Sequence, residues 1–164
     1  MKKIVVSLLS IIIFFSAFST NAFAANKYLA GTHGYWELIG ISKVCQKQVW
    51  SFNKYDSNGL YNPIDYGWVQ SENEVDWYYI KEHVMFDPSN SCLPTYNGSS
   101  WLKIDGRWYL FNPGGALVKK EGWEWSDNAG KWIYWIPGNY GLATNESMVI
   151  NGVTYYFDSN GYMK

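Results

Sequence analysis

The sequence predicts an all-β protein in which tandem β-hairpins stack into a solenoid after an N-terminal signal peptide. Three observations support this fold class: an internal repeat, Asp-Gly and Asn-Gly pairs between short apolar runs, and an excess of aromatic over aliphatic residues. No stretch after residue 25 shows the apolar spacing of a helix. A hairpin of about 20 residues cannot bury one face alone, so successive hairpins are expected to pack on one another.

Residues 1–24 are typical of a secretory signal peptide. Lys2 and Lys3 precede an apolar run over residues 4–18, and small residues before Ala25 provide a cleavage site. A single membrane anchor is the alternative, but the run is shorter than the roughly 20 residues that a span needs. We therefore expect a secreted, extracellular protein that associates with a cell wall, if at all, without a covalent anchor.

The composition of the remaining 140 residues favours a binding surface over a thick core. Without Lys2 and Lys3, eleven Lys and Arg face fourteen Asp and Glu, a balance of −3, so the basic patch of a nucleic-acid binder is not expected. Ten Trp, fourteen Tyr and four Phe lie in this part. Trp and Tyr combine an apolar body with a polar tip, which suits half-exposed stacking surfaces.

Two cysteines, Cys45 and Cys92, lie in the exported part. Outside the cytoplasm such a pair is a disulfide candidate, and two free thiols are the alternative. Their spacing fits no metal motif, and we expect no metal and no cofactor.

The repeat is clearest near the C-terminus. Residues 102–117 align without a gap on residues 148–163, at an offset of 46. Another copy over residues 130–141, with a turn two residues longer, lies between them, so the unit is about 23 residues. Weaker copies occur at 67–80 and at 50–59. The predicted organisation is an N-terminal segment, 25–66, that contains a divergent first repeat, followed by aromatic-rich repeats over 67–164.

Each unit is predicted to be a hairpin. Asp105-Gly106 and Asn151-Gly152 separate short apolar or aromatic runs. This is the strongest short-range signal for a type I′ turn, in which both central residues need φ > 0. A second Gly-rich turn, such as Asp158–Gly161, then passes the chain to the next unit.

Strand alternation divides the aromatic residues between two faces. Trp108 and Leu110 share one face, and Tyr109 and Phe111 share the other. One face is expected to fill the interior, while the other lines grooves that a preceding Trp, such as Trp101, can approach. Rings around a groove can hold a quaternary ammonium group, at roughly 0.5–2 kcal/mol per contact, or stack on sugars. The alternative is that the rings only pack the repeats.

The pattern Gly-Trp…Gly-x-Trp-Tyr-x-x…Gly-x-Leu/Met, which the segments 106–117 and 152–163 carry best, resembles the choline-binding (cell-wall-binding) repeat family. They are similar as well to the glucan-binding repeats of secreted glucosyltransferases and to the C-terminal repeats of large clostridial toxins. The resemblance covers 101–164, more loosely 67–80, and does not extend to 25–49. It implies a β-hairpin solenoid that binds choline on teichoic acids or a carbohydrate.

The resemblance also implies ligand-binding residues. The cage positions of the family fall on six tryptophans of this sequence, and two neighbouring tyrosines join them as candidates: Trp101, Trp108, Trp123, Trp132, Trp68, Trp77, Tyr109 and Tyr134. Two units depart from the pattern by having two extra residues between their Trp positions. The last unit has Ser147 and Thr154 where the family has Trp.

We expect a non-catalytic module. His33 and His83 are the only histidines, and neither stands in a metal or nucleophile motif. Carboxylate pairs such as Glu121 and Glu124 could serve a glycosidase, but a solvated turn is the simpler interpretation. Choline on a wall polymer is the favoured partner, with a glycan as the alternative. A small effector whose residues 25–66 meet a protein partner stays open, as does a dimer through the C-terminal end of the stack.

Overall fold

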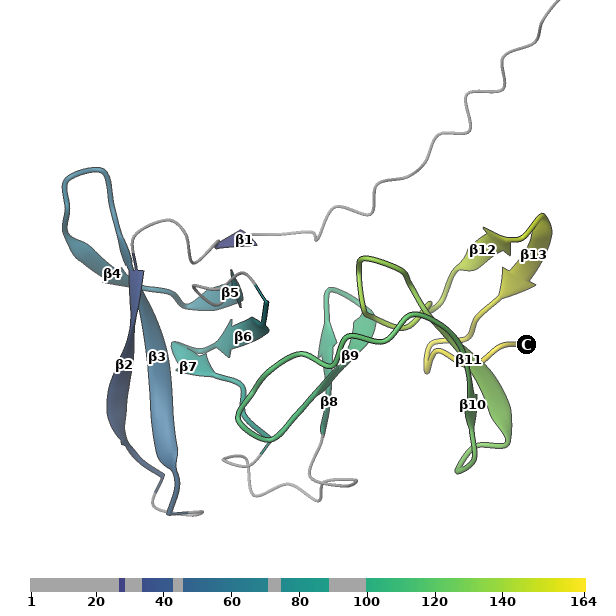
Figure 1. Cartoon of the computed structure of the whole chain (residues 1–164), viewed down its shortest axis with the longest axis horizontal. Coiled ribbons are helices and arrows are strands. Elements are labelled where there is room, and N and C mark those ends of the chain that lie inside the picture. Colours follow the sequence, from purple (N-terminus) through teal and green to yellow (C-terminus); the bar gives the residue numbers. More distant parts are fainter. Residues whose placement is uncertain (1–26, 29–33, 43–45, 71–74, 89–99) are drawn as a thin grey trace, which may run out of the picture.

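The computed structural model describes residues 27–28, 34–42, 46–70, 75–88 and 100–164. The described chain is all-β, as predicted, and its strands form several small sheets (Figure 1). No helix of the described residues is long and apolar enough to cross a membrane. The predicted signal peptide, 1–24, and the disulfide candidates Cys45 and Cys92 lie outside the described residues.

The N-terminal segment forms a three-stranded antiparallel sheet of the strands β2 (Gly34–Ile41), β3 (Gln48–Tyr55) and β4 (Tyr61–Pro63). Its Phe52 is 2% exposed and packs with Val69 and Ile80 of the following sheet. This apolar contact joins the N-terminal sheet to the repeats that follow it.

The following sheet has four strands. The hairpin of β5 (Tyr66–Gln70) and β6 (Trp77–Lys81) is extended on one side by β7 (Val84–Met85) and on the other by β1 (Lys27–Tyr28), which runs parallel to β5. The hairpin covers the weaker repeat copy expected at 67–80.

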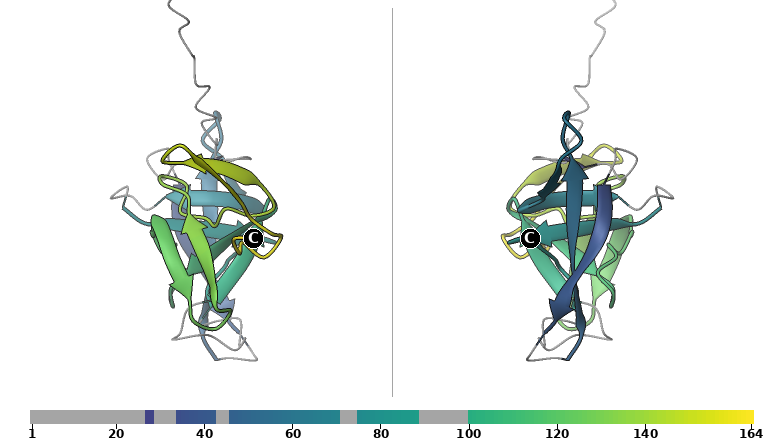
Figure 2. Two further views of the ribbon diagram at one scale, coloured as in Figure 1. Left: turned by 90° about the vertical axis from the view of Figure 1, so that its right-hand side faces the viewer. Right: turned by 90° about the vertical axis from the view of Figure 1, so that its left-hand side faces the viewer.

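Three two-stranded hairpins complete the chain. They are β8 (Ser100–Ile104) with β9 (Arg107–Phe111), β10 (Gly122–Ser126) with β11 (Lys131–Trp135), and β12 (Ser147–Ile150) with β13 (Val153–Tyr156). Figure 1 shows the hairpins following one another in chain order along the long axis. In the end-on views of Figure 2, successive hairpins point in different directions around that axis.

The turns of two hairpins confirm the type I′ prediction. Asp105 and Gly106 have φ of 49° and 84°, and Asn151 and Gly152 have φ of 51° and 80°. The strands pair directly on either side of both turns. Asn, Asp and Gly tolerate this left-handed region better than other residues do, which explains why these dipeptides stand at the hairpin tips.

The return turn of the repeat is confirmed as well. The Oδ1 atom of Asp56 accepts hydrogen bonds from the backbone amides two and four residues later, at 2.8 and 2.9 Å. Asp158 makes the same two bonds at 2.9 Å each. The first unit therefore ends in the same Asp-capped turn as the last, although its strands are longer.

Successive hairpins dock through a repeated backbone contact. In each case the carbonyl of the Trp near the start of one hairpin's second strand accepts a hydrogen bond from an amide that follows the next hairpin. The bonds join Trp77 to Leu117 at 2.7 Å, Trp108 to Leu142 at 2.9 Å and Trp132 to Met163 at 2.9 Å.

Candidate functional site: aromatic interfaces between successive hairpins

One ring pair recurs at the three interfaces between the last four hairpins. A Trp on the first strand of one hairpin lies against an aromatic residue at the end of the next hairpin's second strand or just beyond it. The ring-centroid distances are 5.9 Å for Trp68 and Phe111, 5.4 Å for Trp101 and Trp135, and 5.9 Å for Trp123 and Phe157. The interplanar angles of 19° and 15° bring the rings of the first two pairs close to parallel, whereas the third pair is tilted by 31°.

At the first interface, tyrosines enclose the Trp. Tyr79, which pairs with Trp68 across the hairpin, and Tyr109 of the next hairpin stand nearly edge-on to its ring, at 5.2 and 4.9 Å. Trp68 is consequently only 2% exposed. The Tyr109 hydroxyl donates to Oδ1 of Asn139 at 3.1 Å, and burial raises the pKa of this tyrosine.

The third interface has tyrosines at the same two positions. Trp123 meets Tyr134, its partner across the hairpin, at 5.0 Å and Tyr155 of the last hairpin at 4.8 Å. Trp132 lies edge-on at 6.4 Å and stays 43% exposed. Trp123 itself is partly exposed, so this interface is less closed than the first.

The middle interface lacks both tyrosines. Strand register places Leu110 opposite Trp101, where the other two interfaces have Tyr79 and Tyr134. On the next hairpin, Ile133 takes the position of Tyr109 and Tyr155. With two smaller side chains beside it, Trp101 is 39% exposed.

A groove of about 700 Å³ opens at this middle interface. Its aromatic lining comes from both hairpins and from the return turn of the last repeat: Trp101, Trp108, Trp125, Trp135 and Tyr162. Polar side chains such as Asn112, Asn128 and Asn160 line it too. Ligand pockets combine apolar and aromatic walls with a few polar groups in this way.

Charged groups stand on the wall of this groove. Lys120 Nζ lies 2.8 and 2.9 Å from the two carboxylate oxygens of Glu124 and 5.6 Å from the centroid of the Trp135 ring. The indole N–H of Trp135 donates to Oε2 of Glu124 at 2.6 Å. The groove therefore joins aromatic rings to a carboxylate that is fixed in position.

A second lysine covers the ring of Trp108. Lys103 Nζ lies 5.4 Å from this ring, and the Trp108 indole N–H donates to the carbonyl oxygen of Ser159 at 3.2 Å. An ammonium group near an indole face is the arrangement of a cation–π contact.

The predicted site residues separate into three groups. Trp101 and Trp108 come together in the groove, whereas Trp123, Trp132 and Tyr134 belong to the third interface. Three candidates are buried, at 2%, 7% and 5% exposure, and pack in one core: Trp68, Trp77 and Tyr109. The predicted split of faces is confirmed, because Tyr109 and Phe111 are buried while Trp108 and Leu110 are partly exposed.

Sequence reasoning did not assign Trp125 and Trp135 to the site. Trp125 pairs with Trp132 across its hairpin and points the same way, so strand alternation was a usable signal for it. Trp135 lies on the buried face, and only the packing of two hairpins brings its ring to Trp101.

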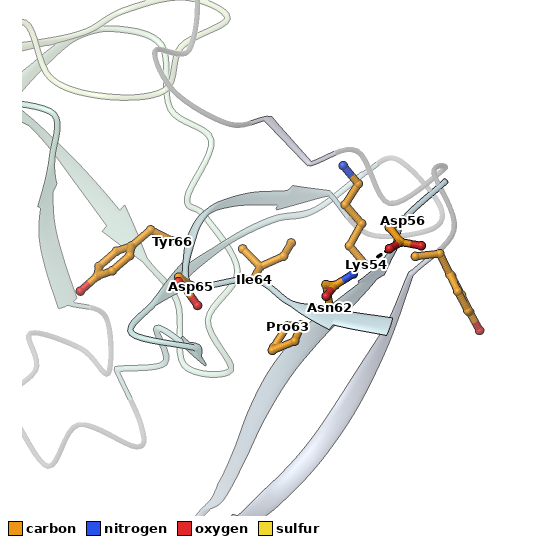
Figure 3. Close-up of a pocket in the computed structure, with 8 residues that line it drawn as sticks. Lys54, Asp56, Asn62, Pro63, Ile64, Asp65 and Tyr66 are labelled. Atoms are coloured by element: carbon orange, nitrogen blue, oxygen red, sulfur yellow. Dashed lines mark hydrogen bonds between the residues drawn. The ribbon is translucent and has the colours of Figure 1, made fainter. Parts of the chain in front are cut away.

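Another hollow, of about 460 Å³, lies in the N-terminal segment between Lys54 and Tyr66 (Figure 3). Tyr66 points away from Asp56 and Asn62 in this view. Hydrogen bonds from backbone amides within the turn occupy the Asp56 carboxylate and lower its pKa. We assign no ligand to this hollow.

The repeated hairpins and their aromatic interfaces define a tandem β-hairpin repeat protein. Residues 99–117 and 150–163 match the family model described as "Putative cell wall binding repeat". These segments are repeats of the choline-binding, cell-wall-binding family, as their sequence resemblance indicated.

Solved structures similar to this chain include the choline binding protein F of Streptococcus pneumoniae, with 25% identity over 72% of this chain and 36% of that one, and a TM-score of 0.43. The choline binding domain of Spr1274 from the same organism shows 26% identity over 39% of this chain and 80% of that one, with a TM-score of 0.30. An alternansucrase in complex with isomaltononaose shows 21% identity over 80% of this chain and 12% of that one, with a TM-score of 0.38. The chain spans about a third of the length of choline binding protein F. A comparison with curated proteins found no match.

Proposed function

We propose that this chain is a secreted, non-catalytic module that binds choline on a cell-wall teichoic acid through the groove between the β8–β9 and β10–β11 hairpins. The observation that carries the proposal is the stack of Trp101 on Trp135. Trp101 is 39% exposed there and lines the same groove as Trp108 and Trp125. It lies at the edge of a segment that matches a cell wall binding repeat.

The chemistry of the groove suits a quaternary ammonium group. Indole faces attract a cation within about 6 Å of the ring centroid, and the attraction grows when the cation is desolvated. Trp101 and Trp108 bring indole rings to the groove from one hairpin, and Trp125 adds a ring from the next. Glu124 supplies a negative charge on the same wall.

We infer that the hairpins form a solenoid that holds this groove in shape. The recurring Trp carbonyl contact and the turned directions of the hairpins in Figure 2 support this inference. In such a stack each unit contacts mainly the units next to it, so the ligand-binding interface can differ from the others while the backbone contact is kept.

A carbohydrate ligand is the second candidate. Asparagine side chains at 112, 128 and 160 line the groove and could bind sugar hydroxyls, while Trp101 could stack on a sugar ring. The two candidates differ in charge, which makes them separable by experiment.

The test is isothermal titration calorimetry of the chain from Ala25 onward with choline and, in parallel, with isomaltooligosaccharides. We expect saturable choline binding that Trp101→Ala weakens about ten-fold, the loss of roughly 1.4 kcal/mol of cation–π contact. Tyr156→Ala is the matched control, because Tyr156 is an aromatic residue that is 60% exposed and is not among the groove-lining residues.

Binding of the sugar without choline would replace the proposed ligand by the second candidate. Absence of both signals would refute a ligand role for the groove and direct the search to residues 25–66 and a protein partner.

A further inference from the structure

We propose that the Glu124 carboxylate makes the groove selective for cations and that the Lys120 ammonium is a resident cation which the ligand displaces. This inference rests on the proposed function, because it concerns the same groove and states why that groove prefers a positively charged ligand to a neutral one.

Glu124 is held in place by the groove itself. Its Oε2 atom accepts the indole N–H of Trp135 at 2.6 Å, and Trp135 is 1% exposed and stacked on Trp101. A carboxylate has about four acceptor positions, so this single bond leaves capacity for a cation. The negative charge therefore has a fixed place beside the ring stack.

The Lys120 ammonium is a cation that is already bound at this position. Its ammonium contacts both oxygens of Glu124, at 2.8 and 2.9 Å, and lies 5.6 Å from the ring of Trp135. A carboxylate and an indole thus recognise one ammonium together, and both Lys120 and Glu124 line the groove. A ligand cation is expected to make the same two kinds of contact, with the Glu124 carboxylate and with an indole ring.

The resident pair is weak enough to exchange. The side chains of Lys120 and Glu124 are 43% and 38% exposed, and ion pairs at such sites contribute little because water screens them. Holding a lysine in one geometry also costs side-chain entropy. An external ammonium that covers more aromatic surface can therefore displace Lys120.

Glu124 is the groove-lining carboxylate that is hydrogen-bonded to the stacked rings, through the Trp135 indole. Asp127 also lines the groove, within the hairpin loop that follows β10. Lys103 lies over Trp108, on the opposite hairpin. The proposed selectivity therefore depends on Glu124 and is opposed by Lys120.

The experiment compares choline with 3,3-dimethylbutan-1-ol, a neutral molecule of nearly the same shape, by calorimetry on the chain from Ala25 onward. Glu124→Gln keeps an acceptor for the Trp135 indole but removes the charge. We expect it to weaken choline about two- to five-fold, as for a partly exposed charge pair, and to leave the neutral analogue unchanged. Lys120→Met should tighten choline by a similar factor.

Glu121→Gln and Lys81→Met are the matched controls. Glu121 accepts the amide of Gly138, Lys81 is an exposed lysine at the end of β6, and neither residue is among those that line the groove. Both variants should bind choline as the unaltered chain does.

Unchanged choline affinity in Glu124→Gln, or weaker binding in Lys120→Met, would overturn this inference while the proposed function stands. If the unaltered chain binds no choline, the proposed function and this inference fail together.

Discussion

The first and the middle of the three aromatic interfaces share a backbone contact and a ring pair, yet one is closed and the other open. Trp68 on Phe111 is 2% exposed, whereas Trp101 on Trp135 is 39% exposed. The docking hydrogen bonds, at 2.7 and 2.9 Å, are nearly the same. The difference lies in the side chains that flank the Trp.

Two substitutions within the repeat accompany the difference. Tyr79 and Tyr109 enclose Trp68, while Leu110 and Ile133 take the equivalent places around Trp101. The repeat therefore keeps its docking geometry while the residues at two flanking positions differ between the closed and the open interface.

The largest expected effect is on stability. Trp68→Ala should lower the free energy of unfolding by about 3–5 kcal/mol, because it removes a fully buried indole. Trp101→Ala should cost only about 1–2 kcal/mol, because part of that side chain already contacts water. Urea unfolding of both variants measures the difference, and equal losses would contradict the distinction between the two interfaces.

The next effect is on binding. Leu110→Tyr places a tyrosine where the other two interfaces have one, and we expect the filled groove to bind choline about ten-fold more weakly, a loss of about 1.4 kcal/mol. Calorimetry measures the affinity, with circular dichroism as a check of the fold.

Val149→Tyr is the control for this variant, because it adds the same side chain at a position that is 70% exposed and is not among the groove-lining residues. Should Leu110→Tyr bind choline as tightly as the control, the flanking positions would not determine which interface is open.

The smallest expected effect depends on pH. Burial raises the pKa of Tyr109 above its usual value of 10.0, although its bond to Asn139 acts in the opposite direction. The unfolded chain then loses this proton at a lower pH than the folded chain. Stability should therefore be unaffected below about pH 9 and fall as the pH rises from 10 through the folded pKa.

Urea unfolding at pH 8 and pH 11 measures this fall. Tyr109→Phe should reduce the slope but not abolish it, because burial raises the pKa of Tyr78 and Tyr79 too. A slope that Tyr109→Phe leaves unaltered would show that the closed interface does not hold Tyr109 in its neutral form.

Local features of the fold were predictable from the sequence because they depend on few residues. The left-handed φ of Asp105-Gly106 and Asn151-Gly152 follows from turn chemistry, and strand alternation separates Trp108 from Tyr109. The Asp-capped return turn at Asp56 could be predicted from its likeness to the turn at 158–161.

The open interface could not be predicted in the same way. Its width depends on Leu110 and Ile133, which are remote in the sequence and act together only after two hairpins dock. Residue-by-residue transfer of the family's Trp positions treats Trp68 and Trp101 as equivalent, because their backbone positions are equivalent. The additional pairing of β1 with β5 and of β7 with β6 also depends on tertiary contacts that no local pattern shows.

The most direct test of the account is a crystal structure of the chain from Ala25 onward with choline. We expect the trimethylammonium group between Trp101, Trp108 and Trp125, with the Lys120 ammonium moved away from Glu124. Choline bound instead against Trp123 and Trp132, with the middle groove empty, would contradict the claim that the two aliphatic flanking residues create the binding site.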